Sequence, residues 1–263
     1  MADDPSAKDI AAAAPELLAA KAKRSFGQTL LLAIAAGVLI GIGSIAFLIA
    51  QAVPGGPSGA TQLLSGLAFS VGLILVTITG AELFTGNAMQ VLPATHGELR
   101  GGRMLLSWAV VWFGNLIGSI ALALLFFAAG GGEGLDGGIA TAAVDVARSK
   151  VGKDAVALLA SGVLANLLVC LAVWGAMAAT SIPAKVLAII GPVTVFVAAG
   201  LEHSIANQSL LPIGWLLQTE HAIGVDGIAY NLALSTAGNL IGGALVALAL
   251  YHGHGGPTPE SLT

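Results

Sequence analysis

Six apolar stretches, each about as long as a helix that crosses the hydrocarbon core of a bilayer, dominate this sequence. Only 9% of its 263 residues are charged, whereas an ordinary soluble domain has about 25%. The charged residues lie mainly in the ends and the short connections. The sequence therefore predicts an all-α membrane protein with six transmembrane helices and little mass outside the lipid. The stretches cover approximately residues 29–50, 63–91, 104–128, 156–179, 186–217 and 228–251.

The two ends of the chain are more polar than the rest. Residues 1–27 show helical periodicity with basic residues near the end. They predict a cytoplasmic amphipathic helix that lies against the membrane surface as an anchor, with gating of a pore as the alternative. The six-helix domain then covers residues 28–252, and residues 253–263 form a polar cytoplasmic tail.

The Lys and Arg residues of the connections predict the orientation, because positive charge accumulates on the cytoplasmic side. If the N-terminus is inside, the inner segments hold seven of these residues and the outer segments three. Both termini are therefore predicted to be cytoplasmic. The seven are Lys8, Lys21, Lys23, Arg24, Arg100, Arg103 and Lys185, and the three are Arg148, Lys150 and Lys153.

The Gly-rich connection at 130–138 lacks the Lys-Ser/Thr pair of a phosphate-binding loop, so we expect a flexible surface loop there. No basic patch suggests nucleic acid, and no metal-ligand cluster or nucleophile partner appears in the apolar stretches. The sequence thus predicts no cofactor, no metal and no enzymatic activity.

An internal repeat relates the two halves of the chain. The signature "GAELFTGN" at 80–87 returns as "GLEHSIAN" at 200–207, and "GNLIG" at 114–118 returns unchanged at 238–242. Each half holds an odd number of spans, so the second half must insert the opposite way up. This pattern predicts a 3+3 inverted repeat, which is typical of transport proteins.

Each signature lies about midway along the second span of its half. Gly, Asn and Ser or Thr are poor helix formers, so we expect helices 2 and 5 to break there. Irregular backbone at that depth is tolerated only where it is buried in protein or lines a wet cavity. The second half-helices would point their positive N-terminal ends toward a small anion.

Polar side chains in the signatures are the candidate functional residues. An ionisable group inside the membrane is functional by default, and His203 is the one histidine deep in a span, able to exchange a proton near neutral pH. Glu82 and Glu202 would repel an anion, so we expect them to turn away and accept hydrogen bonds from freed backbone N–H groups beside Asn87 and Asn207. The glycine pairs Gly37/Gly41, Gly114/Gly118 and Gly238/Gly242 indicate close helix packing.

These motifs resemble those of the formate/nitrite transporter family, in the family's order from residue 28 to 252. The resemblance implies a homopentamer in the bacterial inner membrane, with one aquaporin-like bundle and one pore per protomer. The segment "LFTGN" is nearer the nitrite branch, whereas the signature at 200–207 is close to both branches. The motifs are "FSVGLIL" at 69–75, "GAELFTGN" at 80–87, "WFGNLIGS" at 112–119, "ANLLVCLAVW" at 165–174, "GLEHSIAN" at 200–207 and "GNLIGG" at 238–243.

The resemblance also implies roles for individual residues. The family's central histidine falls on His203 and its partner threonine on Thr85; with Asn166 and Asn207 they would form the proton-relay and substrate-binding site. A lysine near the outer end of the fourth helix, which draws anions to the mouth, falls on Lys150. The outer constriction falls on Phe69 and Phe196, and the apolar inner slit on Leu73, Leu83 and Phe84.

The predicted function is therefore a pH-sensitive channel or proton-coupled transporter for formate, nitrite and similar anions of weak acids. A hydrosulfide or short-chain carboxylate pore, for acetate or lactate, is the alternative on the same scaffold. A membrane-embedded enzyme with Glu202 and His203 as an acid–base pair is a second alternative. A purely structural scaffold is disfavoured, because it has no reason to bear the cost of broken helices.

Overall fold

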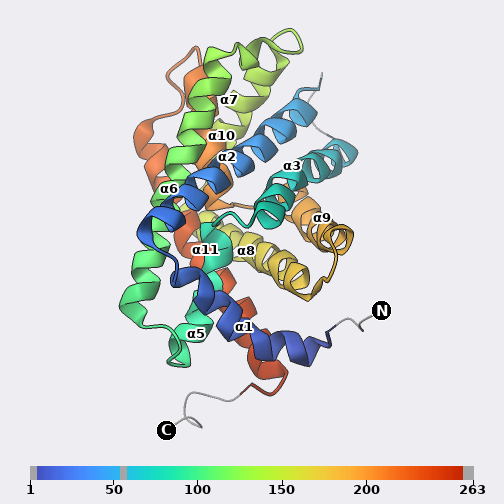
Figure 1. The fold of residues 1–263 in the computed structure, drawn as a ribbon. Coiled ribbons are helices and arrows are strands. Elements are labelled where there is room, and N and C mark those ends of the chain that lie inside the picture. The colour runs from blue at the N-terminus through green and yellow to red at the C-terminus, as the bar shows by residue number, and fades with distance from the viewer. Residues whose placement is uncertain (1–4, 54–57, 257–263) are drawn as a thin grey trace.

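The computed structural model describes residues 5–53 and 58–256, which contain helices and no β-strand (Figure 1). Five helices in this part of the chain are long and apolar enough to cross a membrane, and a sixth, α9, is apolar but shorter. The predicted all-α membrane class is confirmed. The five are α2 (Phe26–Gln51), α3 (Gly59–Thr79), α6 (Gly101–Ala128), α8 (Ala155–Ala178) and α11 (Val225–Gly253), and α9 covers Ile182–Ala198.

Two of the apolar stretches are each divided into shorter elements. After α3 the chain is non-helical until α4, and after α9 it is non-helical until α10. Gly80 and Gly200 stand at these interruptions with φ of 68° and 65°, a conformation that side chains other than glycine adopt only with strain. The elements that follow are α4 (Phe84–Asn87), η1 (Ala88–Gln90) and α5 (Val91–Thr95) in the first case and α10 (Ser204–Leu217) in the second.

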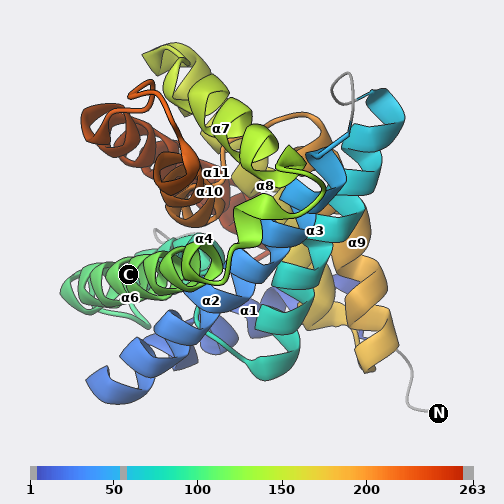
Figure 2. The same cartoon turned by 90° about the horizontal axis from the view of Figure 1, so that it is seen from above.

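The long helices pack in the same arrangement in both halves of the chain. Helix α2 packs against α3 and α6, α8 packs against α9 and α11, and α3 meets α9 between the two groups (Figure 2). Helices α2 and α6 approach closely at Gly37 and Gly118, where an added Cβ would collide with a backbone carbonyl of the other helix. Small residues permit this approach, so the expected role of the glycine pairs in helix packing is confirmed here.

The connection after α6 differs from the expected flexible loop. Residues Gly131–Glu133 form the short helix η2, and Gly138–Val151 form α7, a helix that the sequence pattern did not predict. Gly130 and Gly137 adopt positive φ of 71° and 81° on either side of the turn. Because α7 packs against α10, its position depends on a contact between segments far apart in the sequence.

The N-terminal helix also differs from the expectation. Helix α1 (Ala7–Ala22) begins at Ser6, whose hydroxyl accepts a hydrogen bond from the Asp9 N–H, and its apolar face is buried. That face packs against α5, η1 and α11 rather than facing lipid, and Leu18 belongs to the same buried cluster as Met89 and Leu92. Helix α1 therefore covers the end of its own bundle, opposite α7 (Figure 1). Of the expected tail at 253–263, only residues up to 256 lie within the described part.

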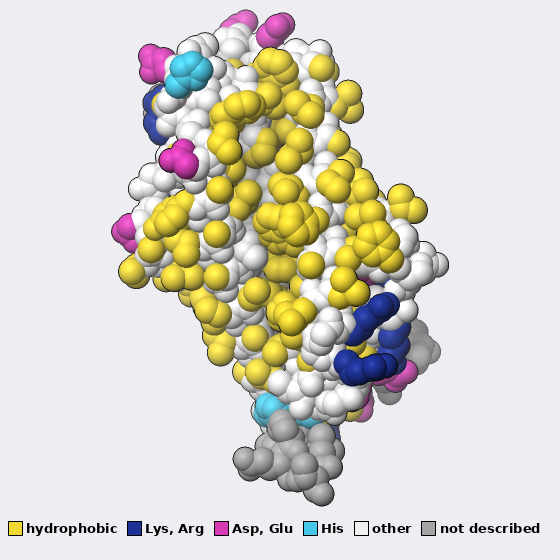
Figure 3. Space-filling model, turned by 90° about the vertical axis from the view of Figure 1, so that its left-hand side faces the viewer, with side chains coloured by type: hydrophobic (Ala, Val, Ile, Leu, Met, Phe, Trp, Pro, Cys, Tyr) yellow, Lys and Arg dark blue, Asp and Glu magenta, His cyan; other side chains and the backbone are white. Residues whose placement is uncertain are grey.

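The outer surface suits a lipid environment. Apolar side chains spread over the middle of the face shown in Figure 3, and most of the Lys and Arg side chains visible there gather at the lower right. Large hydrophobic side chains on several long helices are exposed, among them Leu31, Phe113 and Leu125. In water such a continuous apolar surface would be unfavourable, whereas in a bilayer it faces acyl chains.

Candidate functional site

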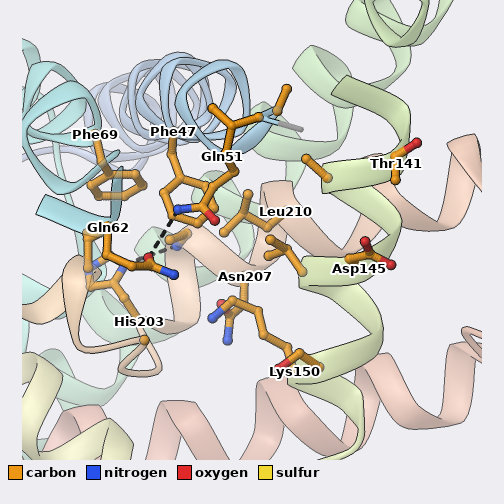
Figure 4. A pocket seen from close by; sticks show the side chains of 18 of the residues that line it. Phe47, Gln51, Gln62, Phe69, Thr141, Asp145, Lys150, His203, Asn207 and Leu210 are labelled. Carbon is orange, nitrogen blue, oxygen red and sulfur yellow. Dashed lines mark hydrogen bonds between the residues drawn. The ribbon is translucent and has the colours of Figure 1, made fainter. Parts of the chain in front are cut away.

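A cavity of about 810 Å³ lies at the α7 end of the bundle and extends inward to His203 (Figure 4). Helices α2, α3, α7, α9 and α10 supply its walls. Polar side chains line its outer part, and aromatic side chains line its inner part. The residues that line the cavity include Phe47, Gln51, Gln62, Phe69, Asp136, Thr141, Asp145, Lys150, Lys153, Phe196, His203 and Asn207.

Two phenylalanines narrow the inner part of the cavity. The rings of Phe69 and Phe196 meet edge to face, with centroids 5.8 Å apart, and both residues are almost completely buried. The Phe196 ring also stacks on His203, with centroids 5.7 Å apart. The structure thus brings together three residues that were predicted to lie at the constriction and the central site.

His203 has a defined arrangement of hydrogen bonds. It is the N-cap of α10, and its Nδ1 accepts a hydrogen bond of 3.0 Å from the Ala206 N–H. A neutral imidazole must then carry its proton on Nε2. That nitrogen lies 2.9 Å from the Thr85 Oγ1, so the ring donates to the threonine hydroxyl. The hydroxyl proton of Thr85 is left free for another acceptor.

Within the described part of the chain, neither predicted asparagine forms a side-chain hydrogen bond with the imidazole. Asn166 Nδ2 donates to the backbone carbonyl oxygens of Thr85, at 3.1 Å, and Asn239, at 2.5 Å. Asn207 Nδ2 donates to Glu202 and Asn231, so of the predicted partners of His203 it is Thr85 that bonds to the ring. The Oδ1 atoms of Asn166 and Asn207 are buried without a hydrogen-bond partner among the described residues.

Glu82 lies at the α1 end of the site. Its carboxylate accepts a hydrogen bond of 2.7 Å from Asn87 Nδ2 and pairs with Arg24, while Lys21 Nζ lies 3.8 Å away. Lys21 also donates to Asn87 Oδ1 at 3.2 Å. Cations from the end of α1 and the turn after it therefore neutralise this buried carboxylate.

Glu202 has a matching environment at the α7 end. It accepts hydrogen bonds from Asn207 at 2.6 Å, Lys153 at 2.7 Å and Lys150 at 3.1 Å. The expectation that both glutamates accept bonds from freed backbone N–H groups is wrong, because side-chain amides and cations are their partners. Lys150 lies in α7 and not in the fourth span. Burial of its ammonium lowers the pKa of Lys150, and the adjacent Glu202 opposes this shift.

Two asparagines outside the predicted site, Asn115 and Asn239, hold the interruptions in place. Asn115 Oδ1 accepts the Phe84 N–H, and Asn115 Nδ2 donates to the Ala33 and Glu82 carbonyls. The second half repeats this arrangement, in which Asn239 contacts Ser204, Gly162 and Glu202. The sequence could have indicated these two residues, since each asparagine is the second residue of a repeated "GNLIG" motif.

Some backbone donors at the interruptions remain unused. The N–H groups of Thr85, Gly86 and Ile205 make no hydrogen bond within the described part of the chain. These groups lie at the N-terminal ends of α4 and α10, where the backbone dipoles favour negative charge. Beyond the constriction, Leu73, Leu83 and Phe84 are buried in the same apolar cluster as Phe69 and Phe196.

Membrane-length helices around a cavity that leads to buried polar groups define a helical membrane protein of the transport class. Residues 8–253 match the family model of the formate/nitrite transporter. The chain belongs to the formate/nitrite transporter family, as the sequence motifs indicated.

Relatives of the chain include channels and transporters. It is 34% identical over 242 residues to the formate channel FocA of Escherichia coli K12, covering 85% of each chain. It is 39% identical over 203 residues to the nitrite transporter NirC of Salmonella typhimurium LT2, covering 75% of this chain and 72% of that protein. A solved pentameric formate channel with formate bound superimposes with a TM-score of 0.80 at 34% identity, over 86% of this chain and 96% of the other.

Proposed function

We propose that this protein is a pH-sensitive channel or proton-coupled transporter that carries formate, nitrite and similar small monovalent anions across the bacterial inner membrane. The observation that carries the proposal is the His203–Thr85 hydrogen bond of 2.9 Å beside unused backbone N–H groups, next to a cavity. Relatives named for formate and for nitrite support both substrates.

The proposed architecture is a 3+3 inverted repeat with spans 2 and 5 interrupted at the two signatures. The equivalent helix pairings in the two halves support it. The equivalent hydrogen bonds of Asn115 and Asn239 also support it, because each asparagine satisfies the first N–H of a second half-helix. By analogy with the pentameric structural neighbour, the functional unit is a homopentamer.

The proposed orientation places both termini in the cytoplasm. Helix α1 then covers the cytoplasmic end, and the cavity opens toward the opposite side. Basic residues at the α1 end, including Lys23, Arg24 and Arg103, agree with the positive-inside rule.

In the proposed mechanism, an anion passes from the cavity between Phe69 and Phe196 and reaches Thr85. The apolar constriction removes water, which makes an unpaired charge costly. The free Thr85 hydroxyl proton and the unused N–H groups offset part of that cost. A weak acid that gains a proton here crosses the apolar slit at Leu83 and Phe84 as a neutral molecule.

His203 would supply or stabilise that proton through Thr85. Protonation of the ring at Nδ1 would break the cap bond to Ala206, so the imidazolium is held only while an anion compensates for it. The protonation of His203 is therefore coupled to the binding of an anion beside it.

A flux measurement tests the proposal directly. Purified protein in sealed liposomes should take up formate and nitrite faster as the external pH falls, because an anion at Thr85 and His203 then gains a proton more readily. Acetate, lactate and hydrosulfide in the same assay distinguish the alternative substrate classes. Uptake of none of these anions above that of empty liposomes would refute the transport function.

The enzyme alternative has less support. Glu202 is bonded to Lys150, Lys153 and Asn207 and makes no hydrogen bond to His203 among the described residues. A general acid–base pair needs both groups within reach of one substrate. The relatives reported above are also channels or transporters.

A further inference from the structure

A chain of hydrogen bonds between uncharged side chains in the outer part of the cavity points to a ligand site. Attraction by positively charged side chains does not account for such a site. Lys150 and Lys153 line this cavity, but both bind Glu202, and Asp136 and Asp145 line it as well. The carboxylates thus outnumber the ammonium groups in and beside the cavity. An anion that waits there needs neutral hydrogen-bond donors.

The donor direction in this chain starts at Ser65. Its Oγ lies 2.7 Å from the Thr61 carbonyl oxygen, and a carbonyl has no proton to give, so the serine hydroxyl must donate. The Ser65 oxygen can then only accept from the group on its other side. That group is the amide of Gln51, at 2.8 Å, which therefore presents its Nε2.

The orientation of Gln51 determines that of Gln62. Gln51 Nε2 also lies 3.1 Å from the second glutamine, which must turn its Oε1 toward this donor. The Gln62 Nε2 is then directed away from Gln51, and it makes no hydrogen bond among the residues described. Figure 4 shows this nitrogen pointing into the cavity.

The position of the Gln62 amide suits the binding of an anion before it reaches the constriction. Gln62 and Phe69 are seven residues apart in α3, which is about two helical turns, or about 10 Å, on the same face. On α2, Gln51 and Phe47 are four residues apart and likewise share a face. Polar side chains of both helices thus stand immediately outside aromatic ones.

We propose that the Gln62 amide, oriented by Gln51 and Ser65, is a neutral binding subsite for a small oxyanion in the outer cavity. Its two N–H groups replace part of the hydration shell of a carboxylate or nitrite before the anion meets Phe69. The subsite rests on the proposed function and adds a residue that sets the affinity for the anion. A neutral donor binds the anion without holding it as firmly as a free cation would, which permits release toward the constriction.

The test compares Gln62→Glu, Gln62→Leu and Thr141→Glu in the full-length protein in proteoliposomes. Gln62→Glu retains an oxygen for Gln51 but replaces the donors, and Gln62→Leu removes the amide without adding charge. Thr141 is exposed on the α7 wall of the same cavity, so Thr141→Glu adds an equal charge elsewhere. Thermal unfolding in detergent establishes that each variant is folded.

Both Gln62 variants should raise the half-saturation concentration for formate, added on the cavity side, by about tenfold, as expected for one lost hydrogen bond to a charged group. The maximal rate should change less than about twofold, because Gln62 lies outside the constriction. Thr141→Glu should change the half-saturation concentration by less than about threefold, as a solvated charge does.

Two results would overturn the subsite while the proposed function stands. One is a wild-type half-saturation concentration in Gln62→Leu. The other is an equal increase in Gln62→Glu and Thr141→Glu with none in Gln62→Leu, which would show a general effect of charge. A wild-type protein that carries no anion would instead refute the proposed function, and the subsite with it.

Discussion

Replacement of His203 by asparagine or by phenylalanine separates the two hydrogen bonds of the imidazole. Asparagine places an oxygen near the position of Nδ1 and is a favourable N-cap, so it retains the bond to the Ala206 N–H but not the bond to Thr85. Phenylalanine removes both bonds. The two variants therefore share the loss of the Thr85 contact and differ at the cap.

The expected magnitudes follow from these contacts. Loss of an N-cap acceptor costs about 0.5–2 kcal/mol, and loss of the bond to Thr85 costs about 0.5–1.5 kcal/mol. His203→Phe should thus lower the free energy of unfolding by about 1–3.5 kcal/mol. His203→Asn should be more stable than His203→Phe by about 1 kcal/mol.

Transport should respond differently from stability. Both variants lack an exchangeable proton on Nε2, so both should lose the dependence of formate and nitrite uptake on pH. The measurements are thermal unfolding in detergent and uptake into sealed liposomes over a pH series. An unchanged pH profile in a folded His203→Asn protein would show that the histidine is only a helix cap. Equal destabilisation in the two variants would contradict the assignment of Nδ1 as the acceptor.

Three further predictions concern other parts of the structure. Phe69→Ala combined with Phe196→Ala removes the edge-to-face contact and should increase lactate uptake, measured by liposome swelling; unaltered permeation of larger carboxylates would argue against a constriction. Asn239→Leu removes three hydrogen bonds and leaves the Ser204 N–H and the Glu202 carbonyl without this partner, at about 1–3 kcal/mol each, and should greatly lower the thermal stability; a wild-type unfolding temperature would contradict this role. Burial and the nearby Arg24 charge lower the pKa of Lys21 from 10.5 to about 8. Lys21 therefore binds its proton less tightly when α1 is packed against the bundle than when α1 is detached. The packing of α1 should accordingly strengthen as the pH rises from about 8 to about 10. Protease cleavage of α1 should become slower over that pH range in the wild type but not in Lys21→Met. Cleavage of the wild type that becomes faster would refute the lowered pKa of Lys21.

Much of the fold was predictable because lipid imposes simple rules on sequence. Apolar stretches such as those around α2, α6 and α11 must be helices of bilayer length, since their backbone groups have no other partners in hydrocarbon. The repeated signatures indicated where helicity would stop, and Gly80 and Gly200 adopt there the backbone that glycine favours.

Elements with weaker apolar periodicity were harder to predict. Helix α7 was not foreseen, because its few charged residues resemble those of an ordinary connection. Helix α1 was foreseen as a helix but assigned to the membrane surface, since an apolar face does not reveal whether it will contact lipid or protein. In the structure it meets Met89 and Leu92.

The sequence by itself determined the membrane class, the family motifs and the identities of the central His203 and Thr85. The tertiary structure alone decided that these residues, 118 positions apart, share a hydrogen bond, and which ring nitrogen takes part in it. It also decided that cations neutralise Glu82 and Glu202 and that Gln62 turns its amide nitrogen into the cavity. The physical reason is that hydrophobicity is a property of each stretch of chain, whereas the direction of a hydrogen bond is settled only when all the partners of a group are in place.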